Sequence, residues 1–275
     1  MGEIFSHLIP ALIWEHFEEI CKYPRPSKKE EKIAEYVFSV GERNNFETFR
    51  DKFGNVIIRK PASPGFENRK TIVLQGHFDM VCEKNSDVIH DFDNEPIDPY
   101  LDNGWVKAKG TTLGADNDIG VAAALAVLED KEIQHGPIEC LFTRDEETGC
   151  TGAAALKSNT LKADILLNLD SEEEGTIYTG CAGGATSYSK FKYVAEIVKN
   201  IWDSYEVKVS GLSGGHSGLE IHKGRGNAIK LLTRFFYSYG KEHKIRISNI
   251  EGGNKDNAIP REAFAVALVT FERCG

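Results

Sequence analysis

The sequence predicts an α/β fold, with a largely parallel sheet flanked by helices and a smaller α+β unit after it. Up to about residue 170, short apolar segments with strand character alternate with helical segments, a pattern typical of parallel strands covered on both faces. Beyond about residue 186 three strand segments surround one helical segment, which indicates an antiparallel sheet. We therefore expect two domains, residues 1–185 and 186–275.

In the first domain, apolar residues recur at helical spacing in residues 11–23 and 29–43. A hairpin is expected at 47–59, with its turn at residues 53–55. The following segments alternate as strand 71–76, helix 119–130, strand 137–143, helix 152–157 and strand 164–170. Because ligands bind outside the carboxyl ends of strands in an open parallel sheet, the residues after these strands are the first candidates for function.

The second domain follows a change of character near the glycines of residues 180–184. Its predicted elements are strand 205–211, helix 227–237, strand 244–250 and strand 263–271. Successive strands without a helix between each pair are typical of an α+β unit with an antiparallel sheet.

Composition and charge exclude several classes of protein. The chain has 33 Lys and Arg against 42 Asp and Glu, a net charge of −9, so we expect neither nucleic-acid nor membrane binding. No apolar run reaches the roughly 18 residues of a membrane span, and no secretory signal is visible. The six cysteines form no C-x-x-C pair, which disfavours a zinc ribbon or a disulfide framework. We expect a cytoplasmic protein.

Polar residues that could hold a metal follow three of the predicted strands and precede one helix. They are His77, Asp79, Asp116, Glu146, Glu147 and Asp170. Carboxylates that converge without compensation repel each other, and divalent cations resolve that charge. Histidine and carboxylate oxygens suit zinc, and a two-metal hydrolytic centre needs a bridging carboxylate and a further carboxylate as general base.

Each of these residues also has an ordinary structural interpretation. A histidine after a strand is more often structural, and Asp116 taken alone is better explained as the N-cap of the helix that begins near residue 118. Glu146 and Glu147 could be solvated surface, as we expect for Glu172–Glu174. The location of four separate elements at one sheet edge favours the metal site.

Five motifs resemble the dinuclear zinc exopeptidases, the family that includes aminoacylases and glutamate carboxypeptidases. They are GHFDM, GTTLGADNDIG, TRDEETG, LNLDSEEEG and GCAGG. Within that family the sequence is most similar to the aminoacyl-histidine dipeptidases, from PRPSKKEE near its start to GGHSG and NAIPREA near its end. The resemblance implies a metalloprotease that hydrolyses small Xaa-His dipeptides such as carnosine with a metal-activated water.

The resemblance also implies a metal site built from four residues. His77 would be a terminal ligand of the first ion, Asp116 the bridge, Asp170 the residue that completes the first ion, and Glu147 a ligand of the second. The cofactor would be two divalent ions, zinc first, with manganese and cobalt as alternatives for such an oxygen-rich site.

Four further residues receive roles from the same resemblance. Glu146 would be the general base, and Asp79 would orient and polarise His77. In the second domain, His216 would stabilise the oxyanion and Asn257 would contact substrate. The second domain would be a lid through which members form homodimers, and His216 would then reach the partner's active site. Without the resemblance, His216 could equally be a histidine in a glycine-flanked turn.

The sequence departs from the family pattern at its end. Family members complete the second zinc with a histidine in a catalytic segment that returns after the lid, and we expect this chain to be truncated before it. The second ion would then have only Asp116 and Glu147 as protein ligands. Two alternatives stay open: an N-acyl amino-acid deacylase of the same family, and a non-catalytic truncated protein that binds or dimerises.

Overall fold

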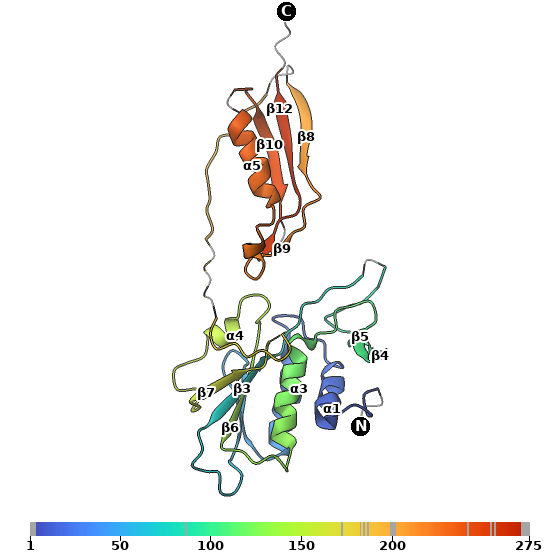
Figure 1. Cartoon of the computed structure of the whole chain (residues 1–275), viewed down its shortest axis with the longest axis vertical. Helices are drawn as coiled ribbons and strands as arrows, with labels where there is room; N and C mark the ends of the chain where they lie inside the picture. Colours follow the sequence, from blue (N-terminus) through green and yellow to red (C-terminus); the bar gives the residue numbers. More distant parts are fainter. Residues whose placement is uncertain are drawn as a thin grey trace, which may run out of the picture. The chain divides into compact units, whose positions relative to one another are not determined.

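The computed structural model describes residues 4–85, 87–171, 173–181, 183, 185, 187–198, 202–240, 242–253, 255 and 257–270. The chain splits into two compact units, Met1–Cys181 and Ala182–Gly275, whose elements are labelled in Figure 1. Within the described ranges, no helix has both the length and the apolar character that crossing a membrane requires.

A five-stranded sheet organises the first unit. Its strands are β1 (Glu47–Arg50), β2 (Val56–Lys60), β3 (Ile72–His77), β6 (Ile138–Thr143) and β7 (Ile165–Asn168), in the order β1-β2-β6-β3-β7. Strands β6, β3 and β7 are parallel, whereas β2 is antiparallel to both β6 and β1. The predicted α/β class is confirmed, and the sheet is mixed because the predicted 47–59 hairpin adds its two strands at one edge.

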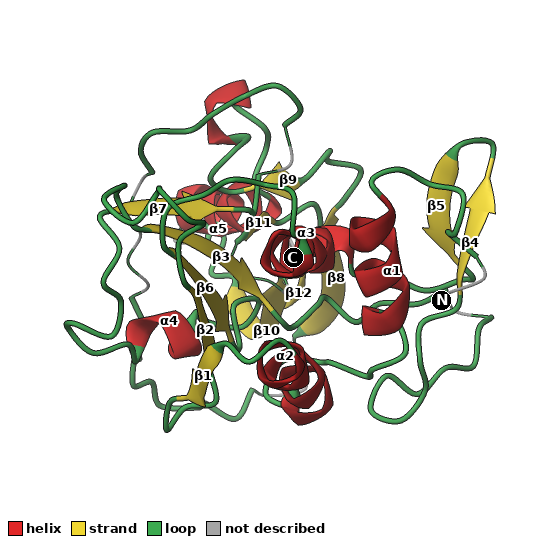
Figure 2. Cartoon of the chain, turned by 90° about the horizontal axis from the view of Figure 1, so that it is seen from below, coloured by secondary structure: helices red, strands yellow, loops and turns green. Residues whose placement is uncertain are grey.

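Four helices accompany this sheet. They are α1 (Ala11–Ile20), α2 (Glu31–Arg43), α3 (Ala115–Glu129) and α4 (Thr151–Ala154). Figure 2 shows α1, α2 and α3 on one side of the sheet and α4 on the other. Helix α4 is shorter than the predicted 152–157, and the hairpin β4 (Pro99–Asp102) with β5 (Trp105–Ala108) was not predicted.

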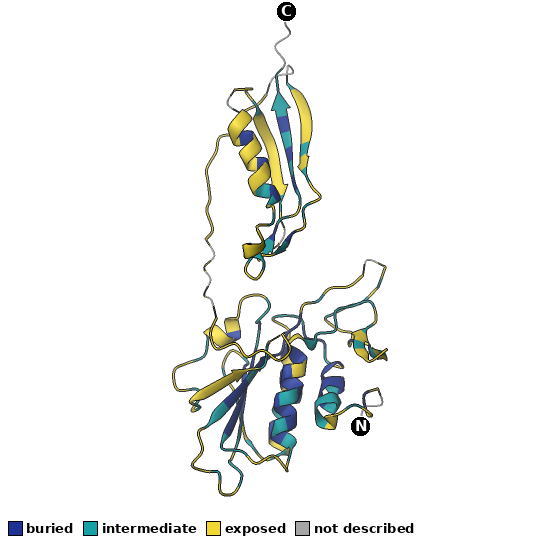
Figure 3. Cartoon of the chain, in the orientation of Figure 1, coloured by how far each residue is buried: buried dark blue, intermediate teal, exposed yellow. Residues whose placement is uncertain are grey.

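Helix α3 and strand β6 form the centre of the core, as Figure 3 shows by their burial. All six residues of β6 are buried, which is typical of an inner strand covered on both faces. Helix α3 is apolar almost all round, and Val121, Ala122 and Leu125 are completely buried. The core therefore fixes the positions of the strand ends and of the start of α3.

The second unit is a three-stranded antiparallel sheet with one helix. Its sheet has the order β10 (Arg246–Gly252), β12 (Ala263–Val269) and β8 (Asp203–Val209). Helix α5 (Ala228–Tyr239) packs on it, and a short ladder joins β9 (Gly215–His216) to β11 (Ala258–Ile259). The 3-10 turn η1 (Ile221–Lys223) lies between them in sequence. The predicted α+β character of this part is confirmed.

Candidate metal centre

The candidate site lies where the parallel strands β6, β3 and β7 end. Strand β3 ends at His77, and Asp79 follows two residues later. The loop of residues 144–150 follows β6, and Asp170 lies two residues beyond the end of β7. Since the strands run in one direction, their following residues meet at one edge of the sheet.

His77 is the buried centre of this cluster. Its side chain is 1% exposed, and its Nε2 lies 3.3 Å from Oδ1 of Asp116 and 3.7 Å from Oδ1 of Asp170. Its Nδ1 lies 2.9 Å from the carbonyl oxygen of Asp79. Burial alone would lower the pKa of His77, but its hydrogen bonds with Asp116, Asp170 and Asp79 raise that pKa to about 12. Nε2 therefore faces the carboxylates of Asp116 and Asp170, and Nδ1 faces Asp79.

Two groups of ligand atoms surround His77, each within a span of 4.8 Å. One group consists of His77, Asp116 and Asp170, and the other of His77, Glu146 and Glu147. One imidazole nitrogen with several carboxylate oxygens is a donor set that fits zinc and related divalent cations. The second group does not include Asp116, so the bridging position of Asp116 stays a prediction.

Both burial and the nearby carboxylates affect the pKa of Glu147. Burial first, and then repulsion from Asp116, raises the pKa of Glu147 to about 7. A proton or a cation must therefore compensate this carboxylate near neutral pH. A divalent cation in the second group would do so, which supports the fit of the residues to a metal.

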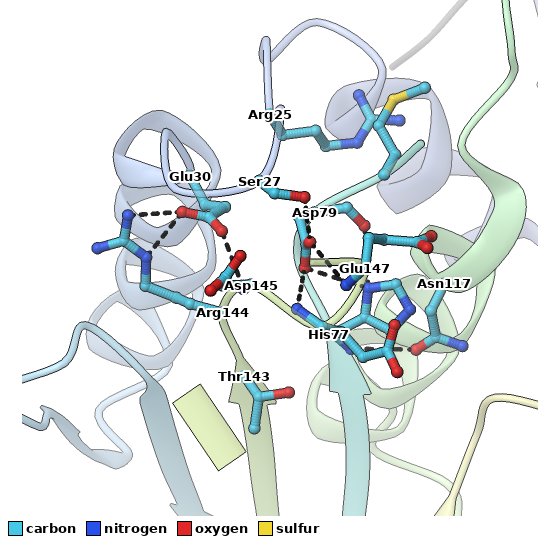
Figure 4. Close-up of polar contacts among 12 residues, drawn as sticks. Arg25, Ser27, Glu30, His77, Asp79, Asn117, Thr143, Arg144, Asp145 and Glu147 are labelled. Atoms are coloured by element: carbon cyan, nitrogen blue, oxygen red, sulfur yellow. Dashed lines mark hydrogen bonds and ion pairs between the residues drawn. The ribbon is translucent and has the colours of Figure 1, made fainter. Parts of the chain in front are cut away.

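Asp79 connects the histidine to the loop that carries the two glutamates (Figure 4). It is completely buried, and its Oδ1 accepts the backbone N–H of Glu146 at 2.9 Å. Its Oδ2 accepts the backbone N–H of Glu147 at 3.1 Å and the hydroxyl of Ser27 at 2.7 Å. Although burial opposes it, these bonds and that to His77 hold the pKa of Asp79 at about 2. Asp79 is therefore an anion that holds four partners: Ser27, His77 and the backbone N–H groups of Glu146 and Glu147.

Asp116 lies before the regular part of α3. Asp116 and Asn117 have non-helical backbone angles, and α3 has no side-chain N-cap. The Asp116 carboxylate is 53% exposed and points to His77 instead, so the N-cap interpretation is wrong for the structure. Asn117 holds this turn in place, since its Oδ1 accepts the N–H of His77 at 3.2 Å and its Nδ2 donates to the carbonyl of Leu169 at 2.6 Å.

Several buried residues around the site were not identified from the sequence. The 144–150 loop depends on Glu30, which is completely buried and accepts the N–H of Asp145 at 2.9 Å and the Nε of Arg144 at 2.8 Å. Asp145 in turn accepts hydrogen bonds from the hydroxyls of Thr148 and Thr151. The PRPSKKEE stretch contains Ser27 and Glu30, but its pattern alone does not reveal their distant partners.

The second unit places its two predicted residues side by side. His216 pairs with Ala258 in the β9–β11 ladder, and the N–H of Ser217 donates to the carbonyl of Asn257 at 2.8 Å. The Nδ1 of His216 accepts the N–H groups of Gly218 and Leu219 at 3.0 Å each. Its Nε2 is then the nitrogen available for a ligand.

Parts of two motifs lie outside the described residues, namely Glu172, Ala182 and Gly184. Glu173 and Glu174 are exposed, as expected for solvated surface.

Comparison with known proteins identifies the family. The profile of peptidase family M28 matches residues 55–215, and the profile of the peptidase dimerisation domain matches residues 207–273. The cytosol non-specific dipeptidase of Escherichia coli is 51% identical over 99% of this chain and 56% of its own length. The aminoacylhistidine dipeptidase structure from Vibrio alginolyticus has a TM-score of 0.73 and 48% identity, over 98% of this chain and 55% of that one.

A more distant structure, the aminopeptidase PepT of Bacillus cereus, has a TM-score of 0.51 at 25% identity, over 95% of this chain and 67% of that one. The chain spans about half the length of the dipeptidases that it matches. It therefore belongs to the family of peptidases that the family M28 profile describes, and it is similar over almost its whole length to the two dipeptidases.

Proposed function

We propose that this chain provides the metal centre and part of the lid of a metal-dependent dipeptidase that hydrolyses Xaa-His dipeptides such as carnosine. The observation that carries the proposal is the convergence of Asp116, Asp170, Glu146 and Glu147 on the buried His77. The names of both dipeptidases that match almost the whole chain support a dipeptide substrate, and the name of the Vibrio alginolyticus structure supports a histidine in it.

The cofactor of the proposal is a pair of divalent cations, with zinc as the first choice. His77 and Asp170 would hold the first ion, Glu147 the second, and Asp116 would bridge the two. When bound, such ions polarise a substrate carbonyl and lower the pKa of an attacking water. Catalytic zinc sites typically have three protein ligands, so the second site would need a further ligand, which the resemblance implies to be a histidine.

The chain's own residues would then carry out the proton transfer. Glu146 is partly buried beside His77, and the bond from its N–H to Asp79 fixes the position of its backbone. Its carboxylate would accept a proton from the attacking water and deliver it to the leaving amine. Asp79 would keep His77 in the tautomer and orientation that direct Nε2 to the cation.

The second unit would have roles of its own. We propose that residues 186–275 form the lid and dimerisation domain and residues 1–185 the catalytic part, which the match of the dimerisation profile supports. His216 would stabilise the oxyanion and Asn257 would contact the substrate. The name of the E. coli relative supports a cytoplasmic location.

The test is an assay of the protein at the length of its dipeptidase relatives. Carnosine-like dipeptides, dipeptides without histidine and N-acetylated amino acids would be offered, each with and without a chelator. Chelator-sensitive hydrolysis of the Xaa-His dipeptides is expected. Hydrolysis of the N-acetylated amino acids alone would identify a deacylase, and no hydrolysis of any substrate would favour a binding or dimerisation role.

A further inference from the structure

One short segment between α1 and α2 contacts three of the four segments that carry the candidate metal ligands. We propose that this α1–α2 segment (residues 25–30) is a positioning element, which holds the ligands at the spacing that a cation requires. The inference rests on the proposed metal centre. It concerns three side chains that touch no candidate ligand atom and act only through neighbours: Arg25, Ser27 and Glu30.

The first contact fixes the turn that carries Asp116. Arg25 and Asp118 are both completely buried, and the Nε of Arg25 donates to Oδ2 of Asp118 at 2.6 Å. The guanidinium also donates to the carbonyl of Leu113 at 3.4 Å. Leu113 and Asp118 lie on either side of Asp116 in the chain, so Arg25 holds both ends of the turn.

The second contact fixes the residue behind His77. The hydroxyl of Ser27 donates to Oδ2 of Asp79 at 2.7 Å. The N–H of Met80 donates to the carbonyl of Arg25 at 3.3 Å, and Pro26 and Met80 form a parallel bridge. The α1–α2 segment therefore holds both the backbone and the carboxylate of the loop after β3.

The third contact fixes the loop of Glu146 and Glu147. The carboxylate of Glu30 accepts the N–H of Asp145 through Oε1 and the side chain of Arg144 through Oε2. Both partners directly precede Glu146 in the chain. Figure 4 shows Glu30 directed at Arg144 and Asp145, and Ser27 beside Asp79.

These contacts bury charged groups, which lose their hydration, so they are better explained by a role other than stabilising the fold. A buried ion pair such as Arg25–Asp118 adds little net stability, because both partners lose their hydration, and the buried carboxylate of Glu30 loses its hydration too. The carboxylates of Asp116 and Asp170, and those of Glu146 and Glu147, have ligand atoms within 4.8 Å of one another in each group with His77, so like charges repel each other there without a cation. A fixed frame that opposes this repulsion keeps the ligand atoms close enough to bind a cation tightly.

The test compares Ser27→Ala with Ser39→Ala in the 275-residue chain. Ser39 is a matched control, because its hydroxyl donates at 2.7 Å to the carbonyl of Tyr36 within α2. Affinity for Co²⁺ would be measured by calorimetry, its coordination by visible absorption, and the metal-free Tm by circular dichroism. We expect Ser27→Ala to weaken Co²⁺ binding about tenfold and to alter the absorption spectrum, as changes behind a metal ligand do. Ser39→Ala should leave both unchanged, and Ser27→Thr should restore binding.

A second pair of variants tests the same role at the third loop. Glu30→Gln should also weaken Co²⁺ binding, whereas Glu35→Gln, which alters an exposed ion pair with Arg50, should not. Unaltered binding in both Ser27→Ala and Glu30→Gln would overturn the positioning role. The positioning role would also be overturned if the losses of Co²⁺ affinity merely followed a lower Tm and were equally large in the control variants. If the unmodified chain bound no Co²⁺, the proposed metal centre itself would be wrong.

Discussion

Oδ1 of Asp79 lies 2.9 Å from the backbone nitrogen of Glu146, so the carboxylate beside His77 also holds the loop of the proposed general base. This bond joins two segments that are 67 residues apart in the chain. The ligand side and the proton-transfer side of the site therefore share one buried anion. A change at Asp79 should affect both.

Replacement of Glu146 by alanine should abolish turnover in the protein of full length. The carboxylate that would accept the proton from water is lost, and general-base catalysis typically contributes about 10²–10⁴-fold to the rate. Metal content, measured by mass spectrometry of the purified variant, should stay close to that of the unmodified protein. The exposed Glu42→Ala is the control. Survival of kcat within a few-fold would show that Glu146 is not the base.

Asp79→Asn should impair metal binding as well as turnover. Asparagine offers one side-chain oxygen where the carboxylate of Asp79 accepts three hydrogen bonds, from Ser27, Glu146 and Glu147. We expect a loss of about 10–100-fold in metal affinity, measured by calorimetry, together with a lower kcat. The same change at the exposed Asp164 should have neither effect. A variant that lost kcat but kept its metal affinity would contradict the joint role of Asp79.

His216→Ala should lower kcat without altering the metal content of the protein, because the candidate metal ligands all lie in the first unit. Loss of a group that stabilises an oxyanion typically costs about 10²–10³ in rate. His222, an exposed histidine in η1, provides the matched control as His222→Ala. Equal rates for the two variants would remove His216 from the proposed site.

Acid should destabilise the metal-free chain partly through His16, a buried histidine far from the candidate ligands in sequence. Burial lowers the pKa of His16, an effect that neighbouring Glu129 only partly offsets. Because the unfolded chain then takes up a proton at a higher pH than the folded chain, stability is lost as the pH falls below about 6.5. Replacement by glutamine should reduce the loss of Tm between pH 7 and pH 5. An unaltered pH dependence in His16→Gln would contradict this assignment.

Much of the fold follows from local patterns in the sequence. The apolar spacing of α2, the Ala-rich α3 and the apolar β6 predict both the elements and their packing, since α2 buries one face and α3 and β6 bury most of their residues. The β4–β5 hairpin was missed although Asn103 and Gly104 are a strong turn signal, and both adopt positive φ, 50° and 82°.

The candidate ligands could be predicted because topology, rather than local sequence, brings them together. His77 and Asp170 follow parallel strands, and parallel strands end at one edge. The supporting residues could not be predicted from the sequence, because Ser27 and Arg25 form hydrogen bonds with partners 52 and 93 residues away in the chain. A serine or an arginine in a loop has no periodic pattern that identifies such a partner.

The most direct test of the metal centre is a crystal structure of the metal-loaded protein, with anomalous diffraction data collected at the zinc edge. We predict an anomalous peak about 2.0–2.2 Å from Nε2 of His77 and from carboxylate oxygens of Asp116 and Asp170. A second peak should contact Glu147. Anomalous peaks elsewhere, with none beside His77, would contradict the account.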